Sequence, residues 1–256
     1  MILLNPKSHD RFYPDERSRE VMLKTIEFFE AKGKARLKED DHGAVWYQDF
    51  LDFVAEERIF ATMCTPGGYG GDDTRWDTWR NCEFGEILGF FGLPYWYSWQ
   101  VTVLGLGPIW MSGNEAVKQR TAQLLDDGAV FAFGLSEQAH GADLYSSEMT
   151  LEPTGDGSYK ANGSKYYIGN ANAAGLISTF GKLADTGEYC FFAVDPTRPG
   201  FDCKQNVVHS QNYVAEFELA DYPYTARWRL EPGEHAFQAR VPNTPIASNV
   251  VRIRVQ

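Results

Sequence analysis

The sequence predicts an α+β chain in which a helical first half is followed by an antiparallel β domain. Apolar residues recur at helix spacing as far as residue 126, and from residue 129 their period changes to two. Asp126-Asp127-Gly128 lies between the two patterns and is typical of a connection. We therefore expect a helical domain over residues 1–128, a β domain over 129–232 and a terminal segment over 233–256. With 256 residues, 43% of them hydrophobic, the chain is long enough for two ordinary cores.

The helices can be placed from their start signals and their apolar spacing. Pro14-Asp15-Glu16 suits a first helical turn, and Met22, Ile26 and Phe29 follow at helix spacing. The last helix is the best defined, because Asn114 can cap its start and Gly128 ends it. A glycine-rich break between Thr65 and Asp73 interrupts the pattern. The remaining helices are predicted at residues 46–57, 74–90 and 95–111.

The strands are predicted from period-two segments separated by turn residues. Residues 130–135 form an apolar run that is typical of a buried strand. Asp156-Gly157 and Asn162-Gly163 are hairpin dipeptides, so we expect residues 146–169 to fold into short antiparallel strands around two turns. Further strands are predicted at residues 188–194, 201–208 and 214–219, separated by Gly, Pro and Asp.

Charge and cysteine usage exclude several classes of protein. The formal net charge of −11 argues against binding to nucleic acid or to anionic lipid. The four cysteines form no C-x-x-C pair and the five histidines lack ligand spacing, so neither zinc nor disulfides are indicated. No stretch approaches the ~20 apolar residues of a membrane helix, and Pro6 interrupts any signal-like segment at the start. We expect a soluble cytoplasmic protein without membrane insertion.

One segment indicates a ligand site. The polar, glycine-containing loop 136–143 follows the predicted buried strand directly, and the aromatic residues Tyr159, Tyr166 and Tyr167 come soon after it. A flavin needs an apolar wall, hydrogen-bonding groups for its polar edge and protection from water, and a loop beside an aromatic meander can supply all three. The simpler alternative is that Phe133 and Tyr167 are ordinary core aromatics and that Ser136 begins a turn.

The same segment resembles the middle-domain signature of the acyl-CoA dehydrogenases. Phe133-Gly134-Leu135-Ser136-Glu137 opens the first motif, which runs to Asp143, and the second motif spans Gly155 to Asn170 at the spacing of that family. About residues 15–239 can be matched to it. The resemblance implies a helical N-terminal domain followed by an antiparallel β-barrel-like middle domain.

The resemblance also implies a set of site residues. FAD would be bound by Phe133, Leu135, Ser136, Tyr167, Ile168 and Gly169, with Tyr167 at the position of the family's tryptophan. Gly169 stands where the family has Thr or Ser, which leaves only its backbone for contact. Ala142 takes the place of a serine that helps to bind acyl-CoA, so one hydroxyl is missing from the implied substrate site.

The implied activity is that of an oxidoreductase of fatty acid metabolism. A flavoprotein of this family removes the α-proton and β-hydride of an acyl-CoA, and passes electrons to an electron-transfer flavoprotein or a similar acceptor. The family's catalytic base lies in a C-terminal helical domain, whereas Pro242 and Pro245 interrupt the corresponding region here. We therefore expect this domain to be absent or altered, and we assign no catalytic residue and no metal ligand. Two alternatives remain: a dehydrogenase that forms oligomers with itself or with a complementary subunit, and a non-catalytic flavin-binding, scaffold or truncated member.

Overall fold

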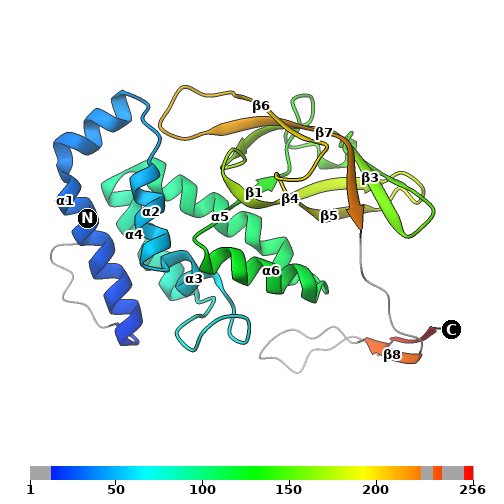
Figure 1. Ribbon diagram of the computed structural model, residues 1–256, viewed down its shortest axis with the longest axis horizontal. Coiled ribbons are helices and arrows are strands. Elements are labelled where there is room, and N and C mark those ends of the chain that lie inside the picture. Colours follow the sequence, from blue (N-terminus) through cyan, green and yellow to red (C-terminus); the bar gives the residue numbers. More distant parts are fainter. Residues whose placement is uncertain (1–12, 226–232, 238–250, 256) are drawn as a thin grey trace. The chain divides into compact units, whose positions relative to one another are not determined.

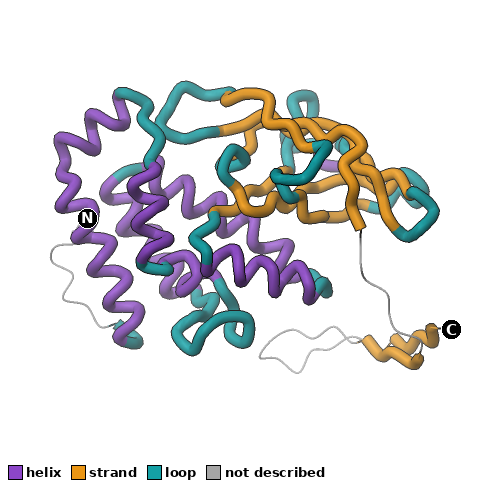
Figure 2. The backbone as a smooth tube through the Cα atoms, in the orientation of Figure 1, coloured by secondary structure: helices purple, strands orange, loops and turns teal. Residues whose placement is uncertain are grey.

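A computed structural model describes residues 13–225, together with the backbones of residues 233–237 and 251–255. The described residues 13–225 lie in one compact unit (Figure 1). Its helices gather on one side and its strands on the other, and α5 and α6 lie nearest to the sheet (Figure 2). The helices are α1 Glu16–His42, α2 Gln48–Glu56, α3 Ile59–Cys64, α4 Thr78–Phe91, α5 Leu93–Met111 and α6 Glu115–Asp126.

The helical first half is confirmed, including its predicted start signals. The side chain of Asp15 accepts a hydrogen bond from the Ser18 amide at 2.7 Å and caps α1, and Asn114 caps α6 in the same way. α1 is longer than its apolar pattern indicated and is broken at Gly33, whose φ of 76° lies outside the helical region. α3 was not predicted, because its six residues are all buried and carry no amphipathic period.

α5 continues through Gly105, Gly107 and Pro108 and packs directly on the sheet. A Cβ atom at Gly105 would lie 2.5 Å from the carbonyl oxygen of Ala132, so only glycine allows this close approach to β1. The Ser178 hydroxyl donates to the Gly105 carbonyl from β4. Glycine in this helix therefore marks the contact between the helical part and the sheet.

The sheet has seven strands, and its pairing is mixed. The order is β1-β4-β2-β3-β7-β6, with β5 paired to β4 outside this path. β1 and β2 pair parallel with β4, whereas the other pairs are antiparallel as predicted. The difference arises because a period of two tells which face of a strand is buried, not the direction of its neighbour. The strands are β1 Val130–Gly134, β2 Thr150–Pro153, β3 Ser158–Gly169, β4 Ala174–Leu183, β5 Tyr189–Val194, β6 Phe201–Asn206 and β7 Val214–Thr225.

One of the two predicted hairpin turns is wrong. Asp156-Gly157 does connect β2 to β3, but Asn162-Gly163 lies inside a continuous β3. Gly163 has a φ of 138° at a register shift against β7, and a Cβ atom there would lie 2.9 Å from the Cα of Met149. The dipeptide therefore forms a β-bulge where another backbone comes close.

Residues from Ala226 onward form a second unit. Within it, β8 Gly233–Phe237 pairs antiparallel with β9 Val251–Val255. The prolines on which we based the expected change in this region, Pro242 and Pro245, lie outside the described residues, as do the first residues of the chain. In the part of the chain that the structure describes, no helix is both long and apolar enough to cross a membrane.

Candidate functional site

The loop that begins at Ser136 is joined to β3 through a reciprocal pair of hydrogen bonds. The Ser136 hydroxyl donates to the Tyr166 carbonyl at 2.7 Å, and the Tyr166 amide donates to the Ser136 carbonyl at 2.9 Å. The two segments that the sequence analysis singled out therefore lie side by side. Because the hydroxyl hydrogen is already used, the lone pairs of the Ser136 oxygen remain to accept a hydrogen bond from a ligand.

A buried ion pair lies directly behind this junction. Lys165 Nζ is 2.7 Å from Glu137 Oε1 and donates to the Leu135 carbonyl at 3.0 Å. The Glu137 carboxylate also accepts hydrogen bonds from the Ser147 hydroxyl and from the amides of Glu148 and Met149. The pair connects β1, the loop and β3, and it fixes the conformation of the loop.

The protonation of Glu137 follows from these contacts. Burial alone raises the pKa of this carboxyl, but the hydrogen bonds from Lys165, Ser147 and the Glu148 amide outweigh burial and hold the pKa below its usual range. Burial lowers the pKa of Lys165, and Glu137 opposes that effect. The oxygens of the Glu137 carboxylate are already occupied by Lys165, Ser147 and two backbone amides, so this residue is a poor candidate for a general base.

The end of β3 is strained and firmly anchored. Tyr167 has a φ of 67°, which is unusual for an aromatic residue, and its side chain is 56% exposed. Ile168, the next residue, is buried in the sheet core. Asn170 also has a positive φ, and its buried amide donates to the Ser98 carbonyl of α5 at 3.0 Å. Strain of this kind, held by surrounding contacts, is frequent at ligand sites.

Gly169 lies under an aromatic ring from the helical part of the unit. A Cβ atom at this position would meet the Cε1 and hydroxyl oxygen of Tyr97, both at 2.7 Å. Burial, and after it the neighbouring Tyr167, raise the pKa of the Tyr97 phenol. Tyr97 was missed by sequence reasoning, because an aromatic residue in a helix rich in aromatics carries no distinguishing signal.

A row of aromatic side chains extends from Phe133 across the sheet; we call Phe133, Phe180, Tyr189 and Phe191 the aromatic shelf. Phe133 stacks on Phe191 with ring centroids 5.4 Å apart, and Phe180 contacts both Phe191 and Tyr189. Phe191 is 40% exposed and Tyr189 38%. The shelf therefore presents a flat apolar surface that starts at the strand leading into Ser136.

An apolar cavity of about 650 Å³ lies between α4 and α5. Trp96, Gln100 and Leu104 line it from α5, and they flank Tyr97 along this helix. Further lining residues include Trp76, Trp99 and Val103. Tyr97, which follows Trp96 in α5, does not line the cavity and instead covers Gly169 at the end of β3.

The remaining loop residues are less constrained. Ala142 is exposed, and no side-chain group of it can form a hydrogen bond. Glu137, His140 and Glu148 bring ligand-type atoms within 4.8 Å of one another. The ammonium of Lys165 already neutralises Glu137, so this cluster is better explained by the ion pair than by a bound cation.

Comparison with known proteins relates this arrangement to one family. No family model matches the chain. The chain is 28% identical over 181 residues to the short-chain-specific acyl-CoA dehydrogenase of Megasphaera elsdenii, covering 68% of this chain and 47% of the relative. It is 36% identical over 104 residues to an acyl-CoA dehydrogenase of Bacillus subtilis, covering 39% of this chain and 27% of the relative. The chain thus spans at most about half the length of these curated relatives.

Solved structures share the fold. Butyryl-CoA dehydrogenase of Megasphaera elsdenii superposes with a TM-score of 0.71 at 23% identity, covering 84% of this chain and 58% of that one. A glutaryl-CoA dehydrogenase of Mycobacterium smegmatis, solved in complex with FADH2, superposes with a TM-score of 0.68 at 19% identity. The match covers 86% of this chain and 56% of that one. These matches define a class of proteins with a helical region followed by a mixed sheet domain. Over the N-terminal and middle parts of that fold, the chain is similar to members of the acyl-CoA dehydrogenase family.

Proposed function

We propose that the chain carries the flavin and acyl sites of an FAD-dependent acyl-CoA dehydrogenase. The observation that carries the proposal is the junction of the Ser136 loop with the strained end of β3, beside the aromatic shelf. A flavin ring is flat and apolar with one polar edge. The shelf fits the first property, and the hydroxyl of Ser136 fits the second.

The six proposed FAD residues would contribute in different ways. Phe133 and the half-exposed Tyr167 offer ring faces, and Ser136 offers its hydroxyl oxygen. Ile168 points into the core, so only its backbone is available, and Gly169 has no side chain. The amide of Leu135 donates to Phe133 and its carbonyl accepts from Lys165, so this residue mainly shapes the loop.

The proposed substrate is an acyl-CoA thioester. The tryptophan-lined cavity between α4 and α5 suits an acyl chain, because it is apolar and because α5 carries both its lining residue Trp96 and Tyr97, which covers Gly169. Ala142 supplies no hydroxyl, so thioester contacts in the loop would come from backbone groups. FAD, when bound, supplies the hydride acceptor for α,β-dehydrogenation. The residues of this chain orient the acyl group, exclude water and hold the loop rigid.

A second candidate function is a flavin-binding subunit without catalysis of its own. It is favoured by Glu137, the buried carboxylate of the loop, whose oxygens already accept hydrogen bonds from Lys165, Ser147 and two backbone amides. Steady reduction of an artificial electron acceptor by the isolated chain in the presence of an acyl-CoA would eliminate this candidate. In a complete dehydrogenase, an electron-transfer flavoprotein or a similar acceptor would remove the electrons.

Reconstitution with FAD tests the proposal. We expect a flavin absorption spectrum that survives desalting. Tyr167→Ala should lower FAD affinity about 3- to 10-fold, since an aromatic contact contributes about 0.5–1.5 kcal/mol beyond area burial. Tyr69→Ala removes a tyrosine from the glycine-rich loop near α6 and should leave the affinity unchanged. A folded protein that is colourless after desalting would contradict the proposal.

A further inference from the structure

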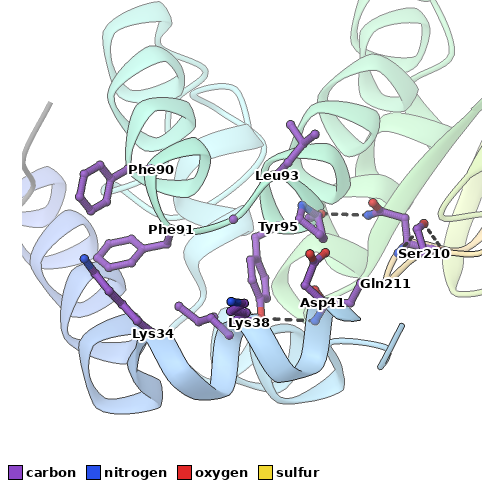
Figure 3. Close-up of a pocket in the computed structure, with 13 residues that line it drawn as sticks. Lys34, Lys38, Asp41, Phe90, Phe91, Leu93, Tyr95, Ser210 and Gln211 are labelled. Atoms are coloured by element: carbon purple, nitrogen blue, oxygen red, sulfur yellow. Dashed lines mark hydrogen bonds between the residues drawn. The ribbon is translucent and has the colours of Figure 1, made fainter. Parts of the chain in front are cut away.

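A second cavity lies apart from the proposed flavin site. It has a volume of about 720 Å³ and lies between the second half of α1, the junction of α4 with α5, and the loop between β6 and β7 (Figure 3). Its walls are therefore built by three segments that are distant in the sequence. Cavities of this size commonly hold small ligands.

The α1 wall of this cavity is the segment that follows the break at Gly33. Gly33 has a φ of 76°, a backbone conformation that favours glycine. A Cβ atom there would meet nothing within 4 Å, so glycine is required by this conformation and not by lack of space. The segment after the break is held by the buried carboxylate of Asp40, which pairs with Lys32 at 3.0 Å and with Arg36 at 2.7 Å. Lys32 also pairs with Asp49. The wall is thus fixed in place by ions that do not line the cavity.

The opposite walls are fixed as well. The side-chain amide of Asn212 donates to the Pro94 carbonyl at 3.0 Å and to the Tyr47 hydroxyl at 3.2 Å, which joins the β6–β7 loop to the start of α5. Gln211 is buried beside Tyr95. No charged residue lines the cavity from these two walls.

The charges of the cavity come from one stripe of α1. Lys34, Lys38 and Asp41 line it at spacings of four and three residues, with Leu37 between them. Neither lysine forms an ion pair with any residue in the described part of the chain, in contrast to Lys32, which precedes the break at Gly33. In a chain of net charge −11, two unpaired ammonium groups facing one cavity create a local preference for anions.

Apolar side chains face the lysines across the cavity. Phe90 is 43% exposed and Leu93 67%, and Phe91 and Tyr95 continue the surface inward. In Figure 3, Lys34 extends from α1 toward the wall that carries Phe91. The cavity therefore combines a cationic side with an apolar side.

We propose that this cavity binds an amphipathic monoanion, namely a carboxylate on an apolar body such as a medium-chain fatty acid. Lys34 and Lys38 would bind the carboxylate, and Phe91 and Leu93 would contact the body. Asp41 leaves the lining with a net charge of +1, which suits a single negative charge better than a phosphate dianion. The site does not depend on flavin binding, since it shares no residue with the proposed FAD site.

Titration with decanoate, followed by NMR on the full chain without FAD, tests this site. Amide shifts should move at Gly92, Leu93 and Tyr95. The indole N–H signals of Trp96 and Trp99 should not move, because no tryptophan lines this cavity whereas three line the one between α4 and α5. Decanol should bind at least 5-fold more weakly than decanoate, and inorganic phosphate should not shift these amides.

Matched variants complete the test. The double variant Lys34→Gln, Lys38→Gln should weaken the binding of decanoate at least 10-fold. Leu93→Ser, which changes a mostly exposed side chain, should weaken it at least 3-fold. Lys160→Gln on β3 removes one positive charge elsewhere and should change nothing. Equal binding by the double lysine variant, equal binding of decanol, or shifts confined to the tryptophans would each overturn the proposal. None of these outcomes bears on whether FAD binds.

Discussion

Gly169 and Tyr97 are in close contact at the junction of sheet and helix, so the size of one side chain limits the size of the other. Gly169→Thr should destabilise the protein by about 1–3 kcal/mol, because its Cβ atom would overlap the Tyr97 ring. In a Tyr97→Ala background the same substitution should cost less than about 1 kcal/mol, since the ring is gone. Urea unfolding of the four proteins of this cycle measures the coupling.

The control for this cycle is Gly141→Thr. Gly141 is exposed, and a Cβ atom there would meet nothing within 4 Å, so the free energy of unfolding should change by no more than about 0.5 kcal/mol. Additive effects of Gly169→Thr and Tyr97→Ala would show that the two residues do not share this space. The measurement needs no flavin and stands apart from the proposed activity.

The site itself was predictable only in part at this scale. The sequence motifs placed Ser136 and Tyr167 in adjacent segments, and the structure joins these segments through Tyr166. The roles of these residues toward FAD stay predictions. Tyr97 and the pairing of Glu137 with Lys165 could not be predicted from local patterns, because both depend on contacts between residues 28 or more positions apart.

Among the elements, the start of α1 depends on one carboxylate with several partners. Asp15 caps the helix and also pairs with Arg75 and with the fully buried Arg80. Burial opposes ionisation, but hydrogen bonds from the Ser18 amide and from Arg75 outweigh burial and hold the pKa of Asp15 far below its usual range. Because the pKa of Asp15 is lower in the folded state than in the unfolded state, its ionised carboxylate stabilises the fold when the pH is above the ordinary pKa near 4. This stabilisation is lost progressively as the pH falls below that value.

Asp15→Asn should therefore destabilise the protein at pH 7 by about 2–4 kcal/mol, because Arg80 loses its charged partner while buried. The difference between wild type and variant should shrink as the pH is lowered from 5 to 3. Thermal unfolding across this range checks the prediction, with the exposed Asp185→Asn as control. A difference that does not vary with pH would show that the charge of Asp15 is not what matters.

Element existence was easier to predict than element pairing. Caps such as Asp15 and Asn114 are local, so the starts of α1 and α6 were correct. β4 was missed because glycines and polar residues interrupt its apolar pattern, although its centre is buried on both faces. The break at Gly33 was missed because a lone glycine inside a helical pattern is usually tolerated.

At the scale of the whole molecule, the aromatic shelf leaves apolar surface in contact with water. Phe191 lies beside the end of α5 across a small cavity lined by Pro108, Ile109 and Ser112, and Met111 at this helix end is 88% exposed. Leu104 and Tyr167 add further exposed apolar area. Exposed apolar side chains in this number are typical of an interface, whether with a second copy of the chain or with a complementary subunit.

We expect the chain to self-associate through this surface, against the repulsion of its net charge of −11. Salt screens that repulsion, and sulfate strengthens apolar burial, so association should increase when sodium sulfate is added. Sedimentation velocity over a range of protein concentrations measures it. Phe191→Ser combined with Met111→Ser should lower the association constant at least 10-fold while leaving the fold intact, and Lys160→Gln should not. A monomer at every protein and salt concentration would contradict this prediction and would show that the aromatic shelf stays exposed to water in the isolated chain.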